Sequence, residues 1–131
     1  MNRPIKFRVW DKLAERMIYP HNGNQQHFII DLNGRFHNLQ NGSGGDDYVI
    51  QQYTGLTDSN DDPIYEGDIL KNHYDVGNNI IGQVLYESDH GGYIFQWKRK
   101  GRGQDYKNLN CDVAFESVIV GNKFEHSELL N

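Results

Sequence analysis

"YTGLTDSNDDPIYEGDIL", residues 53–70, places five acidic side chains between two short apolar patches. Carboxylates this close together either bind a cation or belong to a turn that reverses the chain between two strands. The two interpretations predict different proteins. In the first the segment is a functional site, and in the second it is part of the scaffold.

The cation interpretation rests on alternating oxygen-bearing side chains. Asp58, Asn60 and Asp62 are spaced like the first ligands of an EF-hand calcium loop. Such a loop requires glycine at its sixth position and a bidentate glutamate at its twelfth, and here these positions hold Pro63 and Ile69. The sequence therefore predicts no metal site in this segment.

The turn interpretation agrees better with the residue types. Aspartate and asparagine side chains accept hydrogen bonds from nearby backbone N–H groups and tolerate left-handed backbone conformations. Gly67 provides a position where φ can be positive, and Asp68 can cap the start of the following strand. We therefore expect residues 53–70 to form two strands joined by a tight acidic turn.

The composition favours a β-rich fold. Tyr (8) and Phe (6) outnumber Met (2), and fourteen glycines against three prolines are typical of short strands joined by many turns. No apolar pattern at helical spacing is sustained, so little helix is expected. The net charge of −5 opposes nonspecific attraction to nucleic acid or to an anionic membrane.

The N-terminal region predicts a hairpin. In "IKFRVW", Ile5, Phe7 and Val9 alternate with more polar residues, so Trp10 is expected on the wetter face of a half-buried strand. The segment "RMIYP", residues 16–20, predicts a short return strand that ends at the proline.

A second hairpin is predicted over residues 27–39, where Asn33-Gly34 lies between two apolar runs. This dipeptide suits a two-residue type I′ turn. In a hairpin with such a turn, Leu32 pairs with Arg35, Ile30 with His37 and Phe28 with Leu39.

Five more strands are predicted in the rest of the chain, over residues 48–54, 63–70, 80–87, 92–98 and 116–121. Residues 72–79, 88–91 and 100–112 are expected to be loops. This spacing indicates a small antiparallel barrel or sandwich. The glycine-rich segment 40–47 is the predicted linker, which divides an N-terminal β-hairpin region (1–45) from a β-barrel domain with a C-terminal tail (46–131), unless both form one compact unit.

Patterns typical of catalysis or metal binding are weak. The six histidines lie more than five residues apart, and Cys111 is the single cysteine, expected to be small and half-buried. Glu87, Asp89 and His90 suggest either an acid–base cluster or a solvated hairpin end. We therefore predict a protein that is not an enzyme and uses no metal or cofactor.

One basic segment interrupts the acidic composition. Cations next to aromatic rings can hold a nucleic-acid backbone or the phosphates of a nucleotide. The alternative is that Tyr93, Phe95 and Trp97 share one strand face in the core and that the cations form a solvated hairpin end. The candidate ligand-binding residues are Trp97, Lys98, Arg99, Lys100, Arg102, Tyr106 and Lys107.

Four blocks of the sequence resemble, in order, the signature blocks of the YopX-like family of bacteriophage and prophage proteins. They are "IKFRVWD", "MIY", "QYTGLTDSNDDPIYEGDIL" and "VIVGNKFEHSELL". The chain departs from that pattern at Asn60-Asp61, where relatives often have an Asn-Gly turn.

The resemblance implies an SH3-like barrel, a bacterial host cell that carries a phage or prophage genome, and no known reaction. It also implies a structural role for the most specific block of the family. The motif residues are Tyr53, Thr54, Gly55, Leu56, Tyr65, Glu66, Gly67 and Asp68.

These observations favour a non-catalytic phage or prophage accessory protein that binds an unidentified ligand, with a homo-oligomer as one form. Nucleic-acid binding through residues 98–107 is the first alternative, and capture of a nucleotide signal of host defence is the second. The partner is accordingly a host protein, a nucleic acid, a nucleotide or a second copy. The chain lacks a long apolar run and a signal-peptide pattern, so we expect a cytoplasmic protein without a membrane partner.

Overall fold

Antiparallel strands make up most of the computed structural model, which describes residues 4–20, 23, 25–75, 78–99, 101 and 103–131. The predicted mainly β fold is confirmed. The chain divides into a smaller unit, Ile5–Gln52, and a larger unit built on Tyr53–Asn131. The division falls within one long strand, β5 (Tyr48–Thr57), whereas the glycine-rich segment 40–47 predicts it between residues 45 and 46.

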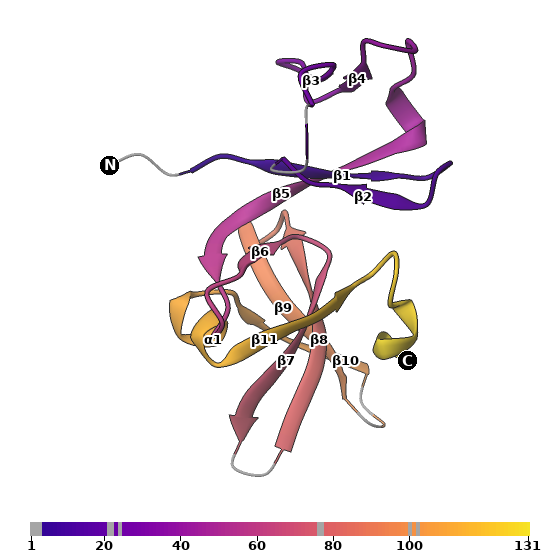
Figure 1. The fold of residues 1–131 in the computed structure, drawn as a ribbon. Coiled ribbons are helices and arrows are strands. Elements are labelled where there is room, and N and C mark those ends of the chain that lie inside the picture. Colours follow the sequence, from indigo (N-terminus) through magenta and orange to yellow (C-terminus); the bar gives the residue numbers. More distant parts are fainter. Residues whose placement is uncertain (1–3, 21–22, 24, 76–77, 100, 102) are drawn as a thin grey trace. The chain divides into compact units, whose positions relative to one another are not determined.

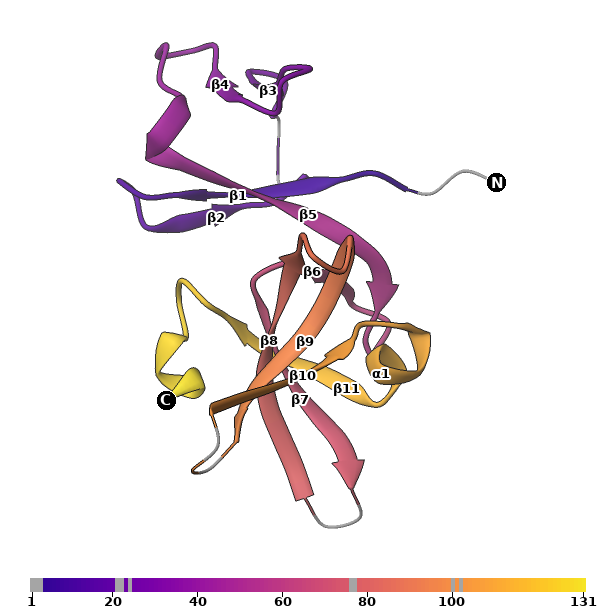
Figure 2. The same ribbon diagram turned by 180° about the vertical axis from the view of Figure 1, so that it is seen from behind.

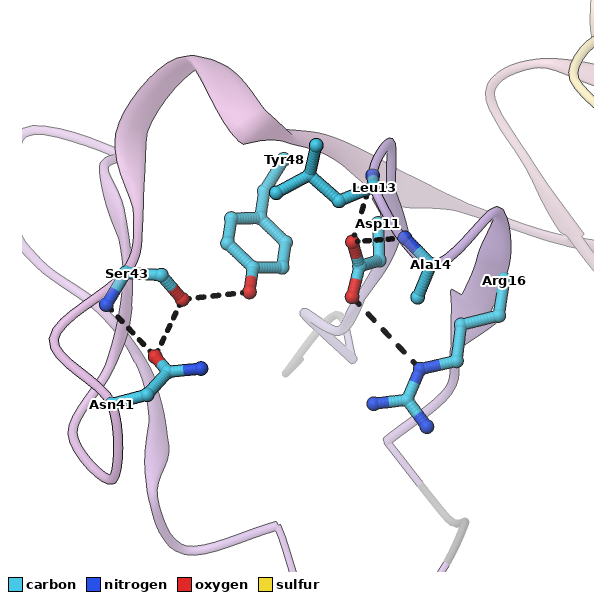
Figure 3. Close-up of polar contacts among 7 residues, drawn as sticks. All are labelled: Asp11, Leu13, Ala14, Arg16, Asn41, Ser43 and Tyr48. Atoms are coloured by element: carbon cyan, nitrogen blue, oxygen red, sulfur yellow. Dashed lines mark hydrogen bonds and ion pairs between the residues drawn. The ribbon is translucent and has the colours of Figure 1, made fainter.

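The smaller unit contains three strands of one antiparallel sheet. The predicted N-terminal hairpin is confirmed as β1 (Phe7–Asp11) and β2 (Arg16–Ile18), and β1 also pairs with the first half of β5 (Figure 1). Asp11 shapes the hairpin turn, because its Oδ1 accepts the backbone N–H groups of Leu13 (3.1 Å) and Ala14 (3.0 Å) (Figure 3).

The prediction that Trp10 lies on a wet face is wrong, because the residue is only 8% exposed. Since β1 is the central strand, Trp10 has a cross-strand neighbour on either side, Met17 and Val49. Arg8 is buried on the same face, and its Nε donates to Oε1 of Gln51 at 2.8 Å. Pairing of this kind is what allows a cationic side chain to be buried.

The second hairpin, β3 (Phe28–Ile30) with β4 (Phe36–Asn38), forms with a register different from the predicted one. Ile30 pairs with Phe36, and Asn33 lacks the positive φ that a type I′ turn requires. The connection is longer because Oδ1 of Asp31 accepts the backbone N–H groups of Asn33 (2.9 Å) and Arg35 (3.0 Å). The one-residue shift exchanges the faces of β4 and buries Phe36.

Residues 40–47 are not the free linker that was predicted. The N–H of Asn38 donates to the carbonyl of Ser43 (2.8 Å), and that of Gly42 donates to the carbonyl of Asn38 (2.9 Å). The hydroxyl groups of Ser43 and Tyr48 are 2.8 Å apart (Figure 3). The segment is therefore attached to β4 and β5, and it ends in the short 3-10 helix η1 (Gly45–Asp47).

The larger unit is a curled antiparallel sheet with the strand order β10-β9-β8-β7-β11 (Figures 1 and 2). This curvature is compatible with the SH3-like barrel that the resemblance implies. The strands are β7 (Asp68–Asp75), β8 (Asn78–Glu87), β9 (Gly92–Arg99), β10 (Gly103–Asn108) and β11 (Ser117–Asn122).

Two elements begin in the segment 100–112, which was expected to be a loop. These are β10 and the helix α1 (Cys111–Phe115), which starts where Oδ1 of Asn110 accepts the N–H of Val113 at 3.0 Å. Residues 72–79 were also expected to be a loop but largely extend β7 and β8. Strand β10 was not predicted because its sequence is polar, and an edge strand needs few apolar residues.

The core of the larger unit confirms that the aromatic residues of β9 face inward. Phe95 is fully buried, and Tyr93 and Trp97 pack against the same cluster. The fully buried Asn72 lies beside it and donates to Oγ of Ser117 (2.8 Å), which in turn donates to the carbonyl of Val113 (2.6 Å). This polar chain joins β7, β11 and α1.

The acidic stretch forms the predicted turn between β5 and β6 (Pro63–Tyr65). Asp58 organises it and is only 4% exposed. Its Oδ1 accepts the N–H groups of Asn60 and Asp62, each at 2.9 Å, and its Oδ2 accepts the N–H of Ile119 at 2.9 Å. The turn is thereby bonded to β11, which follows about sixty residues later in the chain.

The positive φ predicted at Gly67 is confirmed, but it divides the strand that was predicted over residues 63–70. Gly67 has φ +86°, and its N–H donates to the carbonyl of Val84 at 2.6 Å. Oδ2 of Asp68 accepts the N–H of Tyr65 at 2.8 Å, which is the expected cap. The strand predicted over residues 63–70 is therefore two strands, β6 and β7.

The first half of the motif, residues 53–56, also makes contacts that hold the backbone in place. Oγ1 of Thr54 donates to the carbonyl of Ile64 at 2.8 Å. The ring centroids of Tyr53 and Tyr65 are 5.8 Å apart, with the two rings tilted by 52°. Gly55 adopts φ +89° at the point where the pairing of β5 and β6 is irregular.

The C-terminal tail is docked through a histidine. The ring of His126 occupies the space above Gly121 that a side chain would need, and its Nδ1 accepts the N–H of Asn122 at 3.1 Å. The tail ends in the 3-10 helix η2 (Ser127–Leu130), which lies against β8.

We expect Asp58→Ala to lower the free energy of unfolding by about 3 kcal/mol, because three backbone N–H groups lose a charged acceptor. Asp62→Ala is the matched control in the same turn, since this exposed carboxylate accepts none of those three bonds. It should change the free energy of unfolding by less than about 0.5 kcal/mol. Urea unfolding measures both, and equal effects would contradict the role of Asp58.

Asp31 generates a prediction about pH. The hydrogen bond from His37 (Nε2 to Oδ2, 2.9 Å) and then that from the N–H of Arg35 lower the pKa of Asp31 below its usual 3.8. A lowered pKa in the folded state stabilises the hairpin above pH 3.8, and this stabilisation is lost as the pH falls through the lowered pKa.

The variant His37→Ala should therefore raise the pKa of Asp31 toward 3.8. A side-chain carboxyl NMR titration reads this directly. His27→Ala is the control, because the ring of His27 packs on Phe28 (centroids 3.9 Å apart) and is not among the groups that shift Asp31. An unchanged titration of Asp31 in His37→Ala would contradict the assignment.

Candidate binding groove

An open, mainly apolar groove of about 520 Å³ lies within the smaller unit. This volume is in the range of small-molecule sites. The lining residues come from β1, β2, β3, β4 and the segments around them: Ile5, Lys6, Phe7, Val9, Ile18, Pro20, Gly23, Gln25, Gln26, Phe28, Ile29, Ile30 and Phe36.

The period of a β-strand explains one wall of the groove. Alternate residues of a strand point to the same face, which brings the side chains of Phe7 and Val9 to the groove together with the preceding Ile5. Val9 belongs to the buried cluster of this unit, whereas Ile5 is exposed. The wall therefore changes from core to surface along the chain.

The β3–β4 hairpin supplies further lining. Phe28 and Phe36, whose ring centroids are 5.4 Å apart, pack in the core cluster of the unit and also line the groove. Ile29 lines it as well and is 42% exposed. The hairpin thus places a large apolar side chain where solvent or a ligand can reach it.

The chemistry of the lining suits an apolar ligand with a few polar groups. Gln25 and Gln26 provide amides, which both donate and accept hydrogen bonds, and Lys6 is the one cation in the lining of the described groove. The same lining contains no carboxylate, histidine, cysteine or hydroxyl side chain. The arrangement can therefore bind an apolar segment and align it by hydrogen bonds.

No local pattern in the sequence predicts this groove. Its residues are spread over residues 5–36, and each apolar side chain was assigned to a strand face or a hairpin. Only the exposure of each isoleucine in the folded structure reveals which of them remain accessible to a ligand. No local sequence pattern encodes that exposure.

The basic segment lies on the hairpin of β9 and β10. Nη1 of Arg99 is 3.0 Å from Oδ2 of Asp105, and Trp97 packs against the core. Lys98 and Tyr106 are exposed, and Lys107 is partly buried. Lys100 and Arg102 lie outside the described residues. The structure thus brings the described candidates to one hairpin but directs Trp97 inward and pairs Arg99 with an acid.

The Glu87, Asp89 and His90 cluster lies at the turn between β8 and β9. The ring of His90 packs beside that of Tyr106 at 5.0 Å, and Oε1 of Glu87 accepts the N–H of Asp89 at 3.4 Å. These contacts shape a turn. Cys111 is exposed at the start of α1 rather than half-buried as predicted, because this first helical position points to solvent.

Across the described residues, no three His, Cys, Asp or Glu side chains gather in a way that could hold a metal ion. In the same part of the chain, no helix is long and apolar enough to cross a membrane.

Comparison with solved structures supports the fold. The chain is similar to the crystal structure of protein EF1440 from Enterococcus faecalis, with a TM-score of 0.59 and 22% sequence identity. The alignment covers 99% of this chain and 100% of that one. Comparison with curated proteins finds no match to the chain.

Comparison with protein families shows the relationship that the signature blocks suggested. The YopX protein family matches residues 6–131, which include both units. The strands, the acidic turn and the docked tail all lie within the matched range. The chain therefore belongs to the YopX family.

Proposed function

We propose that this chain is a non-catalytic accessory protein of a phage or prophage that binds a host protein. The groove of the smaller unit takes an apolar peptide segment of that host protein. The observation that carries the proposal is the lining of the groove, where exposed Ile5 and Ile29 continue a buried apolar cluster.

The charges support a peptide over a nucleic acid or a nucleotide. Phosphate groups are held by several cations or by a series of backbone N–H groups. Lys6 alone provides a cation in the described lining, and the chain carries a net charge of −5. An apolar peptide needs neither, because burial of its side chains contributes about 25 cal/mol per Å² of apolar surface.

The apolar groups and amides of the groove also support a binding role over a catalytic one. Proton transfer and nucleophilic attack require titratable or nucleophilic side chains at the site. The described lining offers amides and one lysine for polar contacts. Its polar groups therefore suit recognition, and the cytoplasm of the bacterial host is the compartment in which this proposal places it.

Selection from a displayed random-peptide library tests the groove. We expect peptides rich in apolar residues whose binding weakens at least about tenfold in Ile29→Arg, because the new charge would lie against an apolar ligand. Leu32→Arg is the matched control: Leu32 is fully exposed in the β3–β4 turn and does not line the groove. Peptides that bind both variants equally would overturn the proposal.

The alternatives are tested by titrating single- and double-stranded DNA, RNA and nucleotides at low salt. The proposal predicts no binding. Salt-dependent binding that is lost in Arg99→Glu would instead favour the basic hairpin as the functional surface.

A further inference from the structure

Strand β10 is an open edge of the larger sheet. It pairs with β9 on one side, and the strand order ends there within the described residues (Figure 2). An edge strand presents unpaired backbone N–H and C=O groups and can pair with a strand of another chain. The six residues of β10, "GQDYKN", determine which strand of another chain fits this edge.

The hydrogen bonds of the β9–β10 hairpin show which residues of β10 direct their backbone N–H and C=O groups toward the open edge. The N–H of Leu109 donates to the carbonyl of Tyr93 at 3.0 Å. Because hydrogen-bonded pairs alternate along an antiparallel ladder, Gly103, Asp105 and Lys107 direct their backbone groups toward β9. The residues between them direct theirs to the open edge and are exposed: Gln104, Tyr106 and Asn108.

Charge then selects one way for two copies of β10 to pair antiparallel. When Tyr106 lies opposite Tyr106 of a second copy, Gln104 lies opposite Asn108, and every outward backbone group has a partner. In the same register Asp105 lies opposite Lys107, twice. The two neighbouring registers place Asp105 opposite itself or Lys107 opposite itself, and like charges in direct opposition are destabilising.

We propose that two copies of this chain associate edge to edge through β10, about a two-fold axis at Tyr106. The contact is isologous, since Asp105 meets Lys107 of the second copy and Lys107 meets its Asp105. Each of the opposed pairs of outward residues exchanges two backbone hydrogen bonds. Asp105 also forms an ion pair with Arg99 of its own chain, and the side chain of Asp105 is 40% exposed. This inference is independent of the groove in the smaller unit.

Disulfide cross-linking tests both the contact and its register. In a Cys111→Ser background, Tyr106→Cys places two thiols on residues whose Cα atoms are about 5.5 Å apart, a distance that suits a disulfide. In the same background, Gln104→Cys is the control, because the two copies of residue 104 lie roughly 14 Å apart. We expect covalent dimers from the first variant and none from the second. Equal cross-linking of both would overturn the register.

Charge variants test the pairing without cysteine. We expect Asp105→Lys and Lys107→Asp each to be monomeric, because each opposes like charges, and an equimolar mixture of the two to form a dimer. Light scattering reads the mass against the 15.2 kDa of one chain. Arg99→Ala removes only the ion pair within the chain and should leave the dimer intact.

Either of two results would overturn the dimer. One is a wild-type mass of 15.2 kDa at several hundred micromolar protein, and the other is a dimer that survives both single charge variants. Recovery of a dimer in the mixture also shows that both variants are folded.

Discussion

The hydrogen bonds that the Asp58 carboxylate accepts are the interactions on which the larger unit depends. The carboxylate accepts two N–H groups of its own turn and one N–H of β11, so a local turn and a pairing across about sixty residues share one side chain. The N–H of Ser59 adds a bond to the carbonyl of Ser117 at 2.9 Å. A buried charge is tolerated there because its oxygens are hydrogen-bonded, and the turn then determines where β11 lies beside β7.

In this chain, several residues of the stretch 53–68 hold the backbone together. Thr54 and Asp68 each bond a backbone group of β6, and Gly67 turns the chain from β6 into β7. The two surfaces that we propose for recognition lie elsewhere, in the groove of the smaller unit and along the edge of β10.

The two proposed surfaces differ in their chemistry, and that difference follows from how each is built. The groove combines alternate residues of β1 with the β3–β4 hairpin, so the binding that we propose there would draw on apolar burial. The edge of β10 offers mostly backbone groups, with Asp105 and Lys107 to select the register. An apolar surface accommodates many sequences, whereas a charged strand edge discriminates among partners.

Local patterns in the sequence determined the β class, the acidic turn, the left-handed Gly67, the cap at Asp68 and the inward face of β9, because each depends on neighbours in the chain. The register of the β3–β4 hairpin and the attachment of residues 40–47 depend on local hydrogen bonds that the residue pattern did not reveal. Only tertiary structure decided the burial of Trp10, the polar edge strand β10 and the groove. The physical reason is the same in each case. Burial and pairing depend on which distant segments lie alongside, and a short polar or apolar stretch carries no information about what will cover it.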